Sequence, residues 1–175
     1  MFYFNGSVLE AKRDGIPRYA YNVLAELDKI VEPDTMTILF SNIPEDCRFF
    51  KNIKTVELGG NKHWWTIKNC IPYIIKHRGI YVDFRNALCI PGSIVCIHDV
   101  RPMVLQNNEP KSSHRRFALF MYSAKFFAKK VITVSEFTRN ELCEKYHFRK
   151  QKVAVAYNAW NHMSKIKEDK SILYN

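Results

Sequence analysis

The chain has 175 residues, of which 47% are hydrophobic and 25% charged, a composition that is typical of a globular domain and excludes a disordered segment. Its 27 basic and 17 acidic residues give a formal net charge of +10, which favours an anionic partner: nucleic acid, a phospholipid surface or a phosphorylated substrate. No apolar run reaches the roughly 18 residues of a membrane span, and the N-terminus has no signal-peptide pattern, so we expect a cytoplasmic protein.

Cysteine and histidine show no pattern that predicts a metal or a disulfide framework. The five cysteines are an odd number and include no Cys-x-x-Cys pair, which indicates small core residues in a reducing compartment. The six histidines are scattered, with none at metal-ligand spacing. We therefore predict no metal site.

Short apolar runs alternate with amphipathic stretches along the chain, which predicts an α/β fold with a mostly parallel sheet flanked by helices. We expect strands at residues 2–4, 36–40, 55–58, 81–83, 94–97, 131–134 and 153–156. The runs at 94–97 and 131–134 are apolar at consecutive positions, as in strands that helices cover on both faces.

Four helices are expected between these strands. The first has Pro17 in its opening turn and ends before Pro33, and the second runs from about 63 to 78. In the second helix, Pro72 must cause a kink or a restart, and Gly79 is a plausible C-terminal cap. The third starts near residue 112, and the fourth follows Ser135, a good N-cap, and runs to about residue 146.

The carboxyl ends of parallel strands are where ligands bind in such sheets, and polar residues follow three of the expected strands. After the first strand, Gly15, Ile16 and Arg18 lie where a helix begins, a position that suits a phosphate. On its own, a glycine at this position is more often a plain turn residue.

His98 and Asp99 directly follow the strand at 94–97, where they are either site residues or a hydrogen-bonded loop pair. Ser135, Thr138 and Arg139 follow the next strand; the first two could simply cap the helix, and Arg139 could meet an anion or solvent. The sequence has no G-x-S-x-G, Walker or G-x-G-x-x-G motif, which argues against hydrolase, kinase-like and simple dinucleotide-dependent enzymes.

Taken together and in order, these segments resemble the N-terminal, acceptor-side domain of family-four retaining glycosyltransferases, which have the GT-B architecture. The resemblance lies in Gly-Ile-Pro-Arg-Tyr at 15–19, Ile-His-Asp at 97–99, the strand and helix start at 131–139, and Val-Ala-Val-Ala-Tyr-Asn-Ala at 153–159. It covers almost the whole chain, and the four motifs have the family's order and spacing.

The resemblance implies a Rossmann-like domain, the N-terminal half of a GT-B fold, that serves transfer of a sugar with retention at the anomeric carbon. The donor would be a nucleotide diphosphate sugar, the acceptor a glycan or a lipid-linked glycan, and no metal or other cofactor is implied. Gly15 would line the donor phosphate, and His98 and Asp99 would lie near the transferred sugar. Asn158 belongs to the last matching segment and is expected in the cleft with Ser135, Thr138 and Arg139.

The same resemblance divides the chain into an acceptor-side domain at 1–160 and, at 161–175, a linker with the first strand of a separate C-terminal donor domain. Most donor-binding residues of the family lie in that second domain, so we expect these 175 residues to be inactive or nearly so alone. The alternative is a non-catalytic binding module for a glycan, an anionic lipid or a partner chain.

The positive charge is consistent with a peripheral position at the inner face of a membrane. A cluster of Lys62, Trp64, Trp65 and Lys68, together with Arg115 and Arg116, could form an anionic-lipid face, although buried tryptophans with a solvated basic fringe explain the cluster about as well. No nucleic-acid recognition motif is present, which argues against a nucleic-acid partner.

Overall fold

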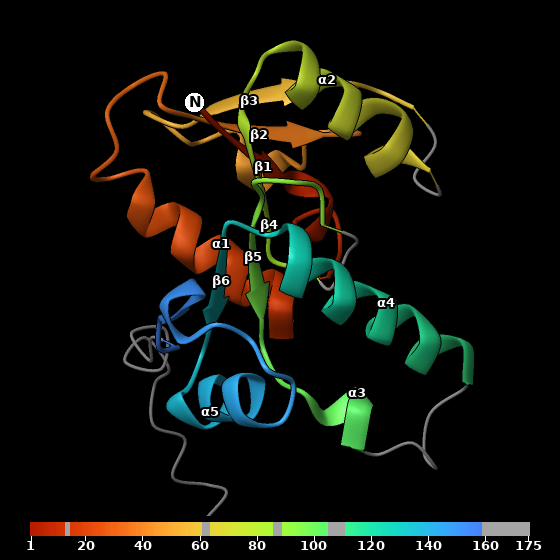
Figure 1. Ribbon diagram of the computed structural model, residues 1–175. Coiled ribbons are helices and arrows are strands. Elements are labelled where there is room, and N and C mark those ends of the chain that lie inside the picture. The colour runs from red at the N-terminus through yellow and green to blue at the C-terminus, as the bar shows by residue number, and fades with distance from the viewer. Residues whose placement is uncertain (13–14, 61–63, 86–88, 105–110, 159–175) are drawn as a thin grey trace, which may run out of the picture.

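One parallel sheet organises the computed structural model, which describes residues 1–12, 15–60, 64–85, 89–104 and 111–158 (Figure 1). Its strands among these residues are β1 (Phe2–Asn5), β2 (Met36–Phe40), β3 (Lys54–Glu57), β4 (Ile80–Asp83), β5 (Ile94–Ile97), β6 (Lys130–Thr133) and β7 (Val153–Val155). The helices are α1 (Gly15–Leu27), α2 (Ile71–Lys76), α3 (Arg101–Val104), α4 (Lys111–Phe127) and α5 (Glu136–Glu144). Shorter turns are η1 (Gly6–Val8), η2 (Glu45–Cys47), η4 (Lys150–Lys152) and η3 (Thr66–Cys70), a π-helical turn that leads directly into α2.

The strand order is β3-β2-β1-β4-β5-β6-β7, and every neighbouring pair is parallel. The chain therefore builds outward from β1 to β3, crosses back to place β4 beside β1, and then builds outward in the other direction. The connections leaving β1 and β4 diverge, and in open α/β sheets this reversal opens the crevice in which ligands bind. The fold is an α/β, Rossmann-like domain.

Alternate side chains of each strand enter two different cores. On one face, Phe4, Val82 and Cys96 pack with Ala20 and Leu24 of α1. The opposite face is covered by η3 and α2 at one end and by α4 and α5 at the other (Figure 1). Its buried residues include Tyr3, Tyr81, Trp65 and Ile74 in the first part, and Val95, Val131, Phe120 and Leu142 in the second. Burial on both faces explains why these strands are apolar at consecutive positions.

The predicted strands are confirmed to within one residue at each end, and the α/β class with a parallel sheet is confirmed with them. The prediction that Pro72 interrupts the second helix is confirmed: the π turn η3 leads into α2, and Pro72 lies in the first turn of α2. A proline ring clashes with the carbonyl oxygen four residues earlier in a regular helix, and the wider π turn before α2 accommodates it.

The end of α2 corrects the prediction that Gly79 supplies the left-handed cap. Arg78 takes that conformation, with a φ of 52°, and the Gly79 N–H then donates to the Ile74 carbonyl oxygen at 3.1 Å. Gly79 is required for space instead. A Cβ at residue 79 would lie 2.1 Å from the ring of Tyr3, which is buried in β1.

Two further expectations concern the cysteines and the C-terminal residues 161–175. Four cysteines are buried and Cys143 is half-buried, as expected for core residues. The predicted linker and strand at 161–175 lie outside the described residues. Within the described part of the chain, no helix is long and apolar enough to cross a bilayer.

Candidate functional site

The loop-to-helix start at Gly15 lies at the carboxyl edge of the sheet, at the head of α1. Gly15 is exposed and has a φ of 44°, a left-handed conformation that favours glycine whether or not a ligand approaches. Arg18 is exposed one turn on, whereas Ile16 is half-buried and packs against the core. Of these predicted phosphate-loop residues, Gly15 and Arg18 are thus available to solvent and Ile16 serves the packing of α1.

His98 follows β5 directly and is half-buried between α1 and the end of β4. Its ring meets the Tyr19 ring edge-on, with centroids 5.0 Å apart, and its Nε2 lies 3.1 Å from the carbonyl oxygen of Phe84. Since a carbonyl oxygen can only accept, Nε2 carries the proton and donates. The Nδ1 of the neutral ring is then an acceptor.

Burial lowers the pKa of His98 below its ordinary value, although the Phe84 carbonyl and the Asp99 carboxylate act in the opposite direction. The imidazole is therefore neutral at physiological pH. A neutral imidazole can accept a hydrogen bond or a proton from a hydroxyl group, which an imidazolium cannot do.

Asp99 is exposed, and one carboxylate oxygen accepts the backbone N–H of Arg101 at 3.0 Å. The contact closes an Asx turn that leads into α3, which begins at Arg101. This contact accounts for the aspartate structurally while leaving its carboxylate at the same edge of the sheet as His98.

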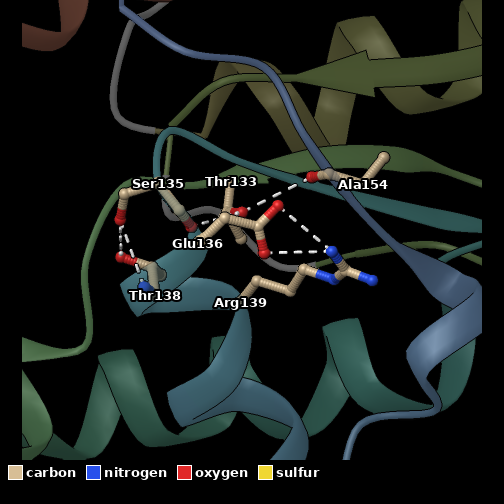
Figure 2. Close-up of polar contacts among 6 residues, drawn as sticks. All are labelled: Thr133, Ser135, Glu136, Thr138, Arg139 and Ala154. Carbon is tan, nitrogen blue, oxygen red and sulfur yellow. Dashed lines mark hydrogen bonds and ion pairs between the residues drawn. The ribbon is translucent and has the colours of Figure 1, made fainter.

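Ser135 and Thr138 bind each other at the start of α5 (Figure 2), and Thr138 also contacts the backbone just after β5. The Ser135 hydroxyl accepts the Thr138 N–H at 3.1 Å, which confirms Ser135 as an N-cap. The buried Thr138 hydroxyl in turn donates to the backbone carbonyl oxygen of His98 at 3.3 Å. Ser135 thus stabilises the first turn of α5, and Thr138 fixes the backbone of His98 relative to that turn.

Arg139 and Asn158 do not join this group. Arg139 makes an ion pair with Glu136, at 3.0 and 3.1 Å, so the Nη1 of its guanidinium already has a carboxylate partner (Figure 2). Asn158 is exposed beyond the end of β7. The structure thus brings together the α1 start, His98, Asp99 and the α5 start. Among the described residues, no hydrogen bond or ion pair joins Arg139 or Asn158 to His98 or Asp99.

A buried polar cluster that the sequence did not predict lies at the point where the strand order reverses. Asn5 ends β1, and its amide donates to the Tyr81 hydroxyl and to the Asp83 carboxylate of β4, each at 2.9 Å. The Tyr81 hydroxyl also donates to Asp83, and the backbone N–H of Arg85 binds the other carboxylate oxygen at 2.6 Å. The available signal was a polar residue ending each of two apolar strands.

Complete burial raises the pKa of Asp83, although Tyr81, Arg85 and Asn5 all oppose the shift. Burial also raises the pKa of Tyr81, so its hydroxyl stays protonated and remains a donor. Because it is fully buried, the Asp83 carboxyl group links β1 and β4 through these hydrogen bonds and does not contact a ligand directly.

Among the described residues, no group of three His, Cys, Asp or Glu side chains could hold a metal ion. The fold and this edge define the class: a Rossmann-like α/β domain with a half-buried neutral histidine at the carboxyl ends of its strands. No protein-family model matches the chain, and a search of curated proteins finds no similar sequence.

Proposed function

We propose that the chain is the acceptor-side domain of a retaining glycosyltransferase that uses a nucleotide diphosphate sugar and has the GT-B architecture. The single observation that supports this best is the meeting of three motif segments at His98. Tyr19, from the motif that opens α1, packs on its ring, and Thr138, from the motif that opens α5, binds its backbone carbonyl oxygen.

In this proposal, His98 binds a hydroxyl group of the transferred sugar or of the acceptor through its neutral ring. Asp99 orients the acceptor hydroxyl, and Gly15 approaches the donor phosphate from the head of α1. A helix N-terminus contributes about 0.3–1 kcal/mol to an exposed anion, whereas micromolar affinity needs about 8 kcal/mol. Tight donor binding therefore requires a second, donor-binding domain beyond residues 1–160.

The experiment is titration calorimetry of the purified chain against a panel of nucleotide sugars, with a sensitive assay for released nucleotide. We expect no micromolar binding and no turnover. Adding a donor-binding domain should produce transfer that His98→Ala abolishes, while Asn158→Ala, outside the His98 group, retains it. Micromolar binding or steady release by the chain alone would contradict the proposal.

A non-catalytic binding module for a glycan, an anionic lipid or a partner chain is the alternative. It predicts ligand binding with no transfer in the presence of any donor domain. Retained glycan binding in His98→Ala, together with absent transfer in the wild type, would favour this alternative.

We propose an anionic membrane surface as a further partner. The exposed side of α4 is the part of the described chain that would bind it. Leu119, Tyr122 and Phe126 are exposed to 57%, 60% and 58%, and with Arg115 they are spaced four, three and four residues apart, along one side of the helix. Residues 111–127 include no acidic side chain, and Lys125 lies over the Phe126 ring at 5.7 Å.

One residue of the cluster that the sequence suggested does not reach the surface. Trp65 is only 2% exposed and belongs to the core under η3, while Trp64 is exposed and Lys62 lies outside the described residues. A basic helix with an exposed apolar side lies in the headgroup region of a bilayer, where each basic residue contributes about 1 kcal/mol.

Co-sedimentation with vesicles of phosphatidylcholine, with and without phosphatidylglycerol, tests the membrane proposal. We expect salt-sensitive binding to the anionic vesicles, lost in a Leu119→Asp, Phe126→Asp double variant. Ile30→Asp, at an exposed apolar residue beyond α1, should bind like the wild type. Equal binding to neutral vesicles, or binding indifferent to salt, would contradict it.

A further inference from the structure

A cluster of basic side chains lies at the amino ends of β6 and β7, at the edge of the sheet opposite to His98. Two separate segments supply it: the end of α4 with the start of β6, and η4 with the residue before it. The pairing of Val131 with Val153 brings these segments side by side. The basic cluster consists of Lys125, Lys129, Lys130, Arg149, Lys150 and Lys152.

Two lysines of the basic cluster are fixed by backbone carbonyl groups. The Lys130 ammonium donates to the Gln151 carbonyl oxygen at 2.8 Å, and the Lys152 ammonium donates to that of Lys125 at 2.7 Å. An ammonium group has three N–H donors, so each of the two has further donors for a ligand. Because these side chains are already held in place, they lose less rotamer freedom when a ligand binds.

The positive charge of the basic cluster is not neutralised by ion pairs with the described residues. The ion pairs there involve other basic residues, such as Lys145, which pairs with Glu141 at 2.8 Å. Burial lowers the pKa of Lys152 and Arg149 lowers it further, whereas Cys89 acts in the opposite direction. An anion placed against the cluster would reduce the repulsion among its members.

So many positive charges close together favour an anionic group that carries more than one charge. A phosphomonoester has a charge of about −1.5 to −2 at pH 7 and three strong acceptor oxygen atoms. It can therefore accept from several lysines at once, in charge-assisted hydrogen bonds. A phosphodiester carries a single charge and has fewer free oxygen atoms.

Exposed aromatic side chains border the basic cluster and indicate a lipid as the source of the phosphate. Phe126 and Phe127 are 58% and 47% exposed and lie between Lys125 and Lys129 in the chain. The cluster is therefore continuous with the exposed apolar side of α4. Lysines at a bilayer surface lie at the level of the headgroups, while neighbouring apolar side chains enter the acyl region. Leu119, on the same side of α4, suits acyl chains and cannot stack on a nucleic-acid base.

We propose that the basic cluster binds the phosphomonoester headgroup of an anionic lipid, with Lys130 and Lys152 as its fixed donors. This inference rests on the proposed membrane partner and adds the class of headgroup that the surface selects. It assigns the headgroup to the amino edge of β6 and β7, and the acyl chains to the exposed side of α4.

The test is binding of the purified chain to phosphatidylcholine vesicles that contain either phosphatidic acid or phosphatidylglycerol, adjusted to equal surface potential. We expect binding to phosphatidic acid to be about tenfold tighter or more. A triple variant of exposed side chains should weaken this binding by a similar factor: Lys129→Gln, Arg149→Gln, Lys150→Gln. The matched control removes the same charge from exposed side chains near β3 and should bind like the wild type: Arg48→Gln, Lys51→Gln, Lys54→Gln.

Four results would overturn the inference. An equal loss of binding in both triple variants would show that only net charge matters. Equal binding to the two kinds of vesicle would show that the headgroup is not selected. Tighter binding to single-stranded RNA than to vesicles would indicate a nucleic-acid partner. Equally tight binding of glycerol 3-phosphate in solution would show that no lipid is needed.

The Leu119→Asp, Phe126→Asp double variant separates this inference from the membrane proposal. Binding to phosphatidic acid that is lost in this double variant but unchanged in the cluster variant overturns the inference and leaves the membrane proposal standing. Binding that is lost in the cluster variant but retained in the double variant supports the basic cluster and overturns the role of the apolar side of α4.

Discussion

Two adjacent residues at the end of α2 have opposite conformational needs. Arg78 occupies a left-handed conformation that glycine adopts without strain, and Gly79 occupies a space in which only glycine fits against Tyr3. We expect Arg78→Gly to raise the free energy of unfolding by about 0.5–1 kcal/mol. Gly79→Ala should lower it by about 1–3 kcal/mol through overpacking.

Urea denaturation of both variants measures these changes. The two substitutions are also each other's control, because one adds a glycine and the other removes one. A destabilised Arg78→Gly would show that the Arg78 side chain contributes more than its backbone strain costs.

His98 gives the folded state a defined pH dependence. Because burial lowers its pKa in the folded protein, the unfolded chain takes up this proton first as the pH falls. Stability from this residue is therefore present above the unfolded pKa, near 6.5, and decreases below it. We expect the wild type to lose more stability between pH 7 and pH 5 than His98→Asn does.

Thermal unfolding across that pH range tests the prediction. His77→Asn, which changes an exposed histidine, is the control and should keep the wild-type pH dependence. Identical pH profiles for wild type and His98→Asn would contradict the burial of a neutral imidazole.

At the scale of elements, one carboxylate joins α1 to the approach to β3. Asp28 lies just beyond α1 and accepts the backbone N–H groups of Lys51, Asn52 and Ile53, at 2.8 to 3.1 Å. Burial alone would raise its pKa, but these three donors lower it below the ordinary value. The ionised form therefore stabilises the fold above pH 4, and this contribution is lost as the pH falls through the lowered pKa.

We expect Asp28→Asn to lower the free energy of unfolding by about 1–3 kcal/mol at pH 7, since an amide offers one acceptor where the carboxylate offers two. The deficit should shrink in acid. Urea denaturation at pH 7 and pH 3 measures it, with Glu144→Gln on the exposed side of α5 as the control. A deficit of equal size at both pH values would show that charge is not involved.

The elements that the sequence predicts well are those whose apolar patterns depend on nothing distant. Strands β5 and β6 are apolar runs, and the Ser135 cap acts within a single turn, so both can be read locally. Pro72 predicts an interruption of the second helix but not its form, a π turn. The left-handed Arg78 was missed, because it goes with the close fit of Gly79 against Tyr3. Propensity alone cannot show such a fit.

The candidate site was predictable only in part, for a related reason. Residues after strand ends can be assigned to one edge of a parallel sheet, which is how His98 and Asp99 were selected. The pairing of Asn5 with Asp83 requires knowing that β1 lies beside β4, and those residues are 78 positions apart. Strand order arises from the packing of the whole chain.

At the scale of the whole molecule, Asn5 joins the two halves of the sheet. Its amide satisfies Asp83 and Tyr81 of β4 inside the protein. We expect Asn5→Ala to lower the free energy of unfolding by about 2–3 kcal/mol, because it removes from the buried cluster the amide that donates to both the Asp83 carboxylate and the Tyr81 hydroxyl. Urea denaturation measures the loss, and Asn140→Ala, at an exposed position in α5, is the control. If Asn5→Ala lowered the free energy of unfolding no more than Asn140→Ala does, Asn5 would not be joining the two halves of the sheet.

The central place of β1 has a consequence for synthesis on the ribosome. Phe2 pairs with Met36 on one side and with Ile80 on the other, so 44 residues separate the emergence of its two partners. At about 5–20 residues per second, that interval lasts roughly 2–9 s. Throughout it one side of β1 offers free N–H and C=O groups, to which another nascent chain can add a strand. A strand that is paired on both sides in the finished sheet is therefore open to misassembly on one side while the protein is being made.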